Sequence, residues 1–222
     1  MRSGVPGAAA AVVARRLQRA AVNAFAAMGA AGLCRGAAAV LAGAAVVFSA
    51  VPARAADTLP LTELARPGRV LMLRHANAPG VGDPPEFKLN DCTTQRNLDA
   101  FGRAQAAELG ARLARAGVTQ AKVYSSQWCR CFETARLLKL GAPAELPALN
   151  SFFGRSQDRE PNLAALRRFL AGLPVNGPPV ILVTHQVTIS GITGEGTASG
   201  GGHLLQLNGS GTPKVLGPIE AN

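Results

Sequence analysis

Two histidines and two arginines occupy positions from which they could act on one anionic group. Arg74 and His75 end one apolar run of the chain, Arg130 follows a second, and His185 ends a third. A neutral imidazole can attack phosphorus and leave again, which divides phosphoryl transfer into two easier steps. Arginines and a second, protonated histidine would stabilise the charge on the phosphoryl oxygens. These residue types therefore indicate metal-independent chemistry through a phosphohistidine.

The three apolar runs predict the strands that would position these side chains. Residues 70–73 are apolar throughout and 180–184 are apolar up to Thr184, as in strands buried on both faces, and 121–125 predicts a strand that leads into a helix. Ligands of open α/β sheets bind at the carboxyl ends of the strands. We therefore expect the three strand ends to form one pocket, to which the start of the following helix adds backbone N–H groups.

The remaining periodicity predicts helices between these strands. Spaced leucines favour helices over about 99–116 and 127–138 and a third around 161–173, and two tail strands are expected near 204–207 and 213–216. Residues 146–153 are read as irregular or as a short strand, and a Gly-rich segment follows the strand 180–184. This alternation predicts an α/β fold: a three-layer α/β/α sandwich with a mostly parallel central sheet. The loop from Ala76 to Cys92 leaves the Arg-His edge directly, and we expect it to cover the pocket as a lid.

The first 56 residues differ in composition from the rest of the chain. They contain no acidic residue, and the apolar run 36–51 is preceded by Arg35 and followed by the small-residue site Ala53-Arg54-Ala55. This pattern predicts a signal peptide over 1–55, with cleavage near Ala55/Ala56 and a possible true start at Met28. The mature domain would be 56–222, periplasmic or secreted, with no stable membrane anchor after processing. The alternative is an uncleaved anchor.

The basic charge of the chain lies largely in that leader. The formal net charge is +10, but six of the 23 basic residues precede residue 57, which leaves 17 basic against 13 acidic residues. No later segment combines a basic cluster with aromatic residues, so we expect no nucleic-acid partner.

Three cysteines remain in the predicted mature chain: Cys92, Cys129 and Cys131. In an oxidising compartment two of them are expected to pair. Cys92 could pair with either Cys129 or Cys131, whereas a bond within the Cys-x-Cys segment would close a strained ring. The spacing does not fit a zinc site, and we expect no metal site.

Four segments in order match the motifs of one enzyme family at similar separations. They are Arg74-His75-Ala76, the helix opening 98–106 with its Leu, Gly and Gln-Ala, the segment 126–135 with its Ser, Arg and Thr-Ala, and Thr184-His185. On these residues the chain resembles the histidine phosphatase superfamily, also called phosphoglycerate mutase-like, and within it a small exported bacterial member. The resemblance covers nearly all of 56–222 and implies the phosphoglycerate mutase-like fold.

The resemblance also implies roles for single residues. His75 would be the phosphoryl acceptor, and Arg74, Arg130 and His185 would bind the phosphoryl oxygens. Asn77 could donate a hydrogen bond to the phosphate, orient a histidine, or bind loop backbone instead. Ala76 replaces the glycine of the family motif, and its methyl group is expected to be tolerated.

The proton donor of the family is missing from both of its expected places. Gln186 follows His185 where one branch has aspartate, and 149–154 contains no acid where the other branch has glutamate. Candidate donors lie in loops: Asp83, Glu86, Asp158 and Glu160. If none of them acts, the leaving group must depart unprotonated, which favours phosphohistidine, acyl phosphate, pyrophosphate or aryl phosphate. A mutase is disfavoured.

The sequence thus predicts a cofactor-free phosphatase that acts on a phosphomonoester or a related compound, either a small phosphorylated substrate or a phosphoprotein. One alternative is a catalytically silent phosphate-binding or interaction module of the same fold. Another is a phosphohistidine carrier in a relay.

Overall fold

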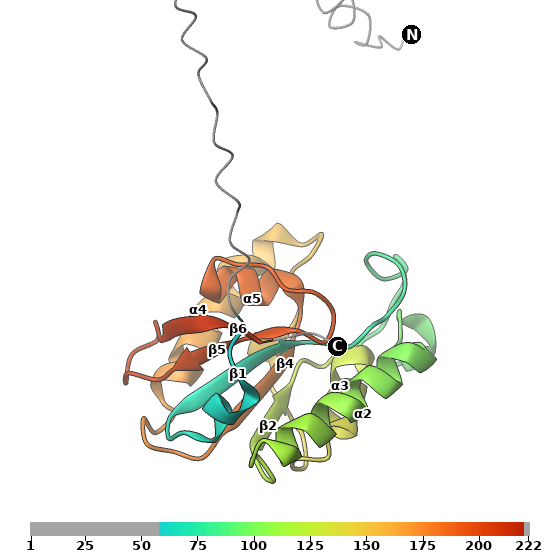
Figure 1. Ribbon diagram of the computed structural model, residues 1–222. Coiled ribbons are helices and arrows are strands. Elements are labelled where there is room, and N and C mark those ends of the chain that lie inside the picture. The colour runs from blue at the N-terminus through green and yellow to red at the C-terminus, as the bar shows by residue number, and fades with distance from the viewer. Residues whose placement is uncertain (1–57, 220–222) are drawn as a thin grey trace, which may run out of the picture. The chain divides into compact units, whose positions relative to one another are not determined.

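A six-stranded sheet forms the centre of the computed structural model, which describes residues 58–219 (Figure 1). The strand order is β3-β2-β4-β1-β5-β6. β4 pairs in parallel with β1 and β2, and β2 pairs in parallel with β3, while β5 is antiparallel to β1 and β6. The strands are β1 (Arg69–Arg74), β2 (Lys122–Ser125), β3 (Ala144–Glu145), β4 (Val180–Thr184), β5 (Gly202–Gln206) and β6 (Lys214–Ile219).

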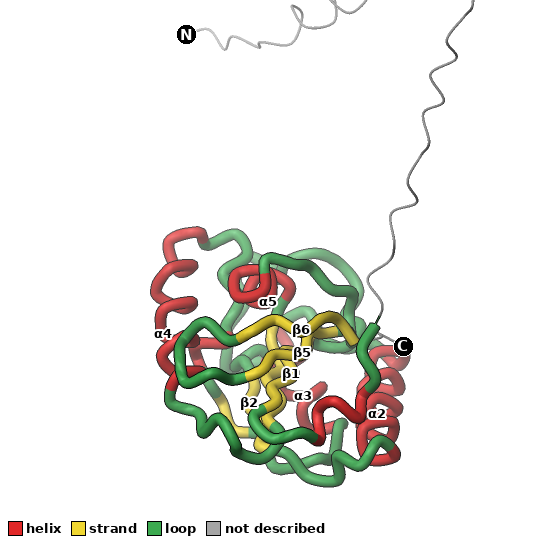
Figure 2. The backbone as a smooth tube through the Cα atoms, turned by 60° about the vertical axis from the view of Figure 1, so that its left-hand side comes forward, coloured by secondary structure: helices red, strands yellow, loops and turns green. Residues whose placement is uncertain are grey.

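Four α-helices cover the sheet within the described range. They are α2 (Ala100–Arg115), α3 (Cys129–Leu137), α4 (Arg159–Ala171) and α5 (Gln186–Thr193). Helices α2 and α3 lie on one face, and α4 and α5 lie on the other (Figures 1 and 2). The predicted three-layer α/β/α sandwich with a mostly parallel sheet is therefore confirmed. Short 3₁₀ helices span Leu61–Ala65, Cys92–Thr94, Pro147–Leu149 and Ser156–Asp158.

The central strand β1 divides the core into two layers. Leu71 and Leu73 pack with leucines of α2 and with α3, whereas Val70 and Met72 pack with α4 and α5. Successive side chains of a strand point to opposite faces, so an apolar run of this kind needs cover on both sides. All four side chains are fully buried. The packing on both faces fixes the strand end that carries Arg74 and His75.

The sequence indicated only a Gly-rich segment after His185, and no helix was predicted there. The segment forms helix α5, and His185 is the residue immediately before its first turn. The glycines of this segment conceal the helix in the sequence. Gly191 serves packing, because a Cβ at this position would lie 2.7 Å from the Cδ2 atom of Leu163 in α4. Gly194 ends the helix with φ +79°, in the left-handed region that glycine adopts readily.

The predicted signal peptide, its cleavage site and the alternative start at Met28 lie outside the described residues. Between residues 58 and 219 there is no helix whose length and apolar character would let it cross a membrane.

Candidate active site

His75 lies at the carboxyl end of the buried strand β1, beside the neighbouring strand β4. Its backbone N–H donates to Thr184 O at 3.0 Å, and its ring Nδ1 lies 2.8 Å from Ala76 O. A carbonyl accepts only from a donor, so Nδ1 carries the proton and Nε2 keeps a lone pair. Burial and the nearby Arg130 charge lower the pKa of His75 to about 3. The ring is therefore neutral, and Nε2 is the nitrogen whose lone pair would make the predicted attack on phosphorus.

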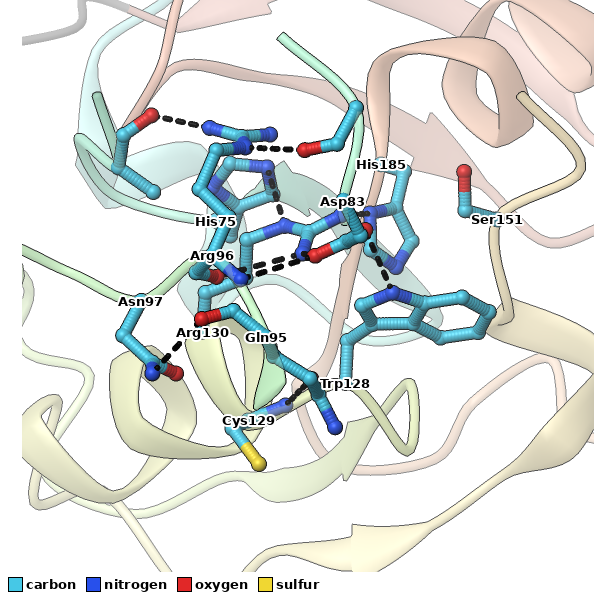
Figure 3. A network of polar contacts seen from close by, with 12 residues as sticks. His75, Asp83, Gln95, Arg96, Asn97, Trp128, Cys129, Arg130, Ser151 and His185 are labelled. Atoms are coloured by element: carbon cyan, nitrogen blue, oxygen red, sulfur yellow. Dashed lines mark hydrogen bonds and ion pairs between the residues drawn. The ribbon is translucent and has the colours of Figure 1, made fainter. Parts of the chain in front are cut away.

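Arg130 links the two histidines from the first turn of α3 (Figure 3). Its Nε donates to His75 Nε2 at 3.2 Å, and its Nη2 lies 3.4 Å from His185 Nδ1. Its Nη1 donates to Asp83 Oδ1 at 2.8 Å. The side chain is only 4% exposed. One buried guanidinium thus orients both rings and carries a positive charge beside the nucleophile.

His185 is held from its other side by a chain of hydrogen bonds. Because Nδ1 accepts from Arg130, Nε2 carries the proton and donates to Ser126 Oγ at 2.9 Å, and Ser126 Oγ in turn donates to Asn150 Oδ1 at 3.2 Å. Burial and the Arg130 charge lower the pKa of His185 well below 6.5. The structure therefore differs from the expected protonated histidine, since His185 is neutral in the unliganded protein.

Arg74 reaches the same pocket from the end of β1. Its Nη1 donates to Thr197 O at 3.0 Å and to Gln186 Oε1 at 3.3 Å, and its Nε is buried with no hydrogen-bond partner in the described part of the chain. Gln186, at the position where one branch of the family has aspartate, thus orients an arginine.

Together these side chains line a pocket of about 550 Å³. Arg74, His75, Arg130 and His185 form its polar part, and the segment 80–85 with Phe87 forms one wall. The loop expected to act as a lid therefore does border the pocket. Two neutral imidazoles and several arginines around one cavity suit a phosphoryl group, because the cations match its charge and the lone pair of His75 can reach phosphorus.

The comparisons with known proteins agree with this geometry. The model of the histidine phosphatase superfamily (branch 1) matches residues 70–153, which include Arg74, His75 and Arg130. This match confirms the predicted resemblance to the histidine phosphatase superfamily over residues 70–153. His185 lies beyond the matched residues. No curated protein sequence matches the chain.

Solved structures of this fold are similar over most of their length. The protein histidine phosphatase SixA complexed with tungstate has 17% identity and a TM-score of 0.50, over 69% of this chain and 97% of SixA. Mycobacterial hydrolase 1 has 16% identity and a TM-score of 0.51, over 70% and 99% of the two chains. Mycobacterial hydrolase 2 has 18% identity and a TM-score of 0.51, over 71% and 93%. At these identities the likeness shows the shared fold alone.

Of the four candidate proton donors, only Asp83 lines the pocket. Its Oδ1 accepts from Arg130 Nη1 and from the Arg96 backbone N–H at 3.0 Å, and its Oδ2 accepts from Trp128 Nε1 at 3.0 Å. Burial alone would raise the pKa of Asp83, but these donors and the Arg130 charge lower it below the usual value. Asp83 is therefore an ionised partner of Arg130 and a poor acid.

The other three candidate donors are not among the residues that line the pocket. Asp158 pairs with Arg155 at 3.2 Å, Glu160 pairs with Arg159, and Glu86 is exposed. The structure does not support their assignment as donors, because none of them lines the pocket that holds the two histidines.

The structure also does not support the predicted role of Asn77 as a phosphate ligand. Its Nδ2 donates to Asp99 Oδ2 at 2.9 Å, away from the pocket lining. Asp99 also caps α2, accepting from the Gly102 N–H at 2.6 Å. Gly102 is required here because a Cβ would lie 2.0 Å from Asn77 O. The Asn77 side chain thus fastens α2 to the segment that follows the nucleophile.

The cysteine pairing left open by the sequence is Cys92–Cys129 in the structure. The bond joins the end of the lid loop to the first residue of α3, next to Arg130. Cys131 is reduced and buried, with Sγ 3.4 Å from His185 Nε2, and burial raises the pKa of its thiol to about 12. It is an inert packing residue.

Arg96 and Gln95, which shortly precede helix α2, brace the lid. Arg96 donates from Nε to Gly82 O at 2.7 Å and from Nη1 to Ala78 O, which holds the loop beside Asp83. Gln95 accepts from the Cys129 N–H at 3.0 Å and donates to Lys88 O at 2.8 Å. These contacts join residues whose pairing no local pattern reveals. Between residues 58 and 219, no cluster of three or more His, Cys, Asp or Glu residues is placed to hold a metal ion.

Proposed function

We propose that this protein is a metal-independent phosphatase that hydrolyses a phosphomonoester or related compound through a phosphohistidine on His75. The observation that carries the proposal is the hydrogen bond from His75 Nδ1 to Ala76 O, which leaves the Nε2 lone pair beside Arg130. The match of residues 70–153 to the superfamily model supports a phosphatase or mutase-type enzyme in general. The proposal that the enzyme is a hydrolase that acts through a phosphohistidine on His75 rests on the geometry of the pocket.

The proposed reaction has two displacements at phosphorus. The Nε2 lone pair of His75 forms a bond to phosphorus, and the bond to the leaving oxygen breaks with its electron pair on that oxygen. Water then attacks the phosphohistidine, the P–N bond breaks with its pair on Nε2, and the water proton passes to solvent as phosphate forms. Arg74 and Arg130 stabilise the phosphoryl oxygens in both steps.

His185 would acquire its charge on binding. It is neutral in the unliganded pocket, and a phosphate dianion beside it favours the protonated form. The imidazolium would then donate to a phosphoryl oxygen during transfer. Binding should therefore take up a proton from solution.

We also propose that the protein is exported, as a periplasmic or secreted enzyme. The N-terminal pattern of residues 1–55 supports export. The Cys92–Cys129 bond adds support, because disulfides persist in oxidising compartments and Cys92 is exposed. The substrate would be a phosphorylated small molecule or protein in that compartment.

Hydrolysis of 4-nitrophenyl phosphate in EDTA tests the phosphatase proposal. We expect turnover that releases inorganic phosphate and that falls by about 10³-fold or more in His75→Ala. After rapid quenching, the parent should carry an acid-labile, alkali-stable phosphoryl group that His75→Ala lacks. Full turnover in His75→Ala, or loss of activity in EDTA, would overturn the mechanism.

A catalytically silent phosphate-binding module is the second candidate. The observation in its favour is the ionised state of Asp83, which leaves the pocket without a carboxylic acid donor. Such a module would bind phosphate at the same pocket but release no nitrophenol, so the same assay separates the two. A stable phosphoenzyme that water does not clear would instead indicate a phosphohistidine carrier.

A further inference from the structure

We infer that the substrate class is an aryl phosphate, whose ring binds an apolar subsite next to His75. The subsite has an inner wall of Phe87 and Trp128 and an outer rim of Val81 and Phe153, all of which line the pocket. The inference rests on the proposed function, because the leaving group matters only if His75 takes the phosphoryl group.

A continuous row of rings runs from the nucleophile to the inner wall. The ring centroids of His75 and His185 lie 5.6 Å apart, those of His185 and Trp128 5.1 Å, and those of Trp128 and Phe87 5.5 Å. These separations are in the range in which aromatic rings interact favourably. A leaving group on a phosphate at His75 is therefore next to an aromatic surface.

The rim exposes large apolar side chains to solvent. Val81 is 88% exposed and Phe153 is 58% exposed, and a Cβ on Gly82 would lie 3.8 Å from the Phe153 ring. Four large apolar side chains are exposed within residues 58–219, and two of them, Val81 and Phe153, line this pocket. Apolar groups that gather at the mouth of a pocket are typical of a ligand site.

The charges of the pocket suit a leaving group that departs as an anion. Its lining contains four arginines, Arg74, Arg96, Arg130 and Arg155, against the single carboxylate of Asp83. Arg155 lies over the inner wall, with Cζ 5.3 Å from the Trp128 ring and 6.0 Å from the Phe87 ring. A negative charge that develops on an oxygen beside these rings would meet a cation.

The lack of a carboxylic acid that could protonate the leaving group also favours an aryl phosphate as substrate. Asp83 is ionised by Arg130, Trp128 and the Arg96 amide, so it has no proton to give. A phenol has a pKa of about 10, like tyrosine, and its phenoxide can leave without prior protonation, whereas an alkoxide cannot. The P–O bond then breaks with its electron pair on the aryl oxygen, and solvent protonates the phenoxide afterwards.

Acyl phosphates and phosphohistidine also lose their leaving groups without a proton donor. Neither leaving group explains why the pocket has both an aromatic wall and an apolar rim. Flat apolar leaving groups gain from burial against these rings. Among leaving groups that need no proton, the subsite therefore favours the aryl oxygen.

Steady-state kinetics of the full chain on three substrates test the inference. Phenyl phosphate and cyclohexyl phosphate have apolar rings of similar size but different leaving oxygens, and acetyl phosphate has a good leaving group without a ring. The variant is Phe153→Ala, whose side chain is exposed and whose loss should not affect folding. The matched control is Phe101→Ala, because Phe101 is 61% exposed on α2 and does not line the pocket.

We expect kcat/KM for phenyl phosphate to exceed that for cyclohexyl phosphate by at least about 10²-fold. Phe153→Ala should lower kcat/KM for phenyl phosphate about tenfold more than that for acetyl phosphate, and mainly through KM. Phe101→Ala should alter neither.

Three results would overturn the inference, and they are distinguishable. Equal rates on phenyl and cyclohexyl phosphate would reveal a proton donor. Equal losses on phenyl and acetyl phosphate in Phe153→Ala would leave the phosphatase proposal intact and remove the aryl subsite. Failure of the parent to hydrolyse any of the three, with no phosphoryl group on His75, would remove the proposed function itself.

Discussion

The Nε atom of Arg130 lies 3.2 Å from the Nε2 atom of His75 and donates a hydrogen bond to the lone pair that would attack phosphorus. The same guanidinium contributes, after burial, to the lowered pKa of His75. Burial and Arg130 together therefore keep the His75 ring neutral, and the hydrogen bond from Arg130 orients it before any substrate binds. Arg130 also contacts Asp83 and His185, so one side chain connects both histidines and the lid carboxylate.

Arg130→Lys keeps the positive charge but removes the planar fork, so one ammonium cannot contact both histidines and Asp83 at once. We expect kcat/KM for 4-nitrophenyl phosphate to fall by about 10²-fold. Arg103→Lys is the matched control, because Arg103 pairs with Glu133 on the surface at 2.6 Å. Steady-state kinetics check the result, and equal activity of the two variants would contradict the central role of Arg130.

Stability should fall as the pH drops below about 6.5. His75 and His185 have lowered pKa values in the folded protein, so between the unfolded value near 6.5 and pH 5 only the unfolded chain binds their protons. Each histidine then removes up to about 1.4 kcal/mol of folding free energy per pH unit. Urea unfolding at pH 7 and pH 5 measures the loss.

His75→Gln provides the internal comparison for this pH dependence. It removes one of the two buried imidazoles, so its stability should fall less steeply between pH 7 and pH 5 than that of the parent. Above pH 7 both proteins should show no slope from these groups. An unchanged slope in His75→Gln would mean that His75 is not held neutral by the fold.

The strand ends show how much of the site a sequence can predict. β4 has the predicted bounds Val180–Thr184, and the side chains at the ends of β1 and β4 meet because buried parallel strands end at one edge. Helix α5 was missed because its glycines conceal a helix that packs closely on Leu163. The catalytic roles assigned to the four pocket residues remain predictions.

Contacts across the lid could not be predicted. Asp83 reaches Arg130 across 47 positions of sequence, and Arg96 folds the loop by binding carbonyl oxygens that every residue has. The role of Asn77 could not be predicted for a similar reason. Its side-chain amide can donate to a phosphate or to a carboxylate, and in the structure it donates to Asp99. The local pattern of apolar residues predicts where a strand ends, whereas the contacts of a loop depend on which distant residues the fold brings beside it.

The disulfide should matter to both stability and turnover. Cys92 and Cys129 are 37 residues apart, and closing a loop of this size contributes about 3 to 4 kcal/mol in the chain-entropy model. Cys92→Ser should lower Tm and should lower kcat/KM, because it frees the end of the lid that places Asp83 beside Arg130. Treatment with a reductant should reproduce both effects in the parent. Cys131→Ala should keep the parent's sensitivity to reductant, since Cys131 is not in the bond.

Asp83→Asn decides whether this side chain donates a proton or only positions Arg130. The structure favours positioning, because three donors hold the carboxylate ionised. The amide keeps the shape and loses the ion pair, so we expect kcat/KM to fall about tenfold or more, with equal losses on 4-nitrophenyl phosphate and phenyl phosphate. A general acid would behave differently, because the poorer phenyl leaving group depends more on protonation and would lose more activity. The ratio of the two losses is therefore the measurement: a ratio near one supports an ion pair that positions Arg130, and a much larger loss on phenyl phosphate would make Asp83 the missing acid.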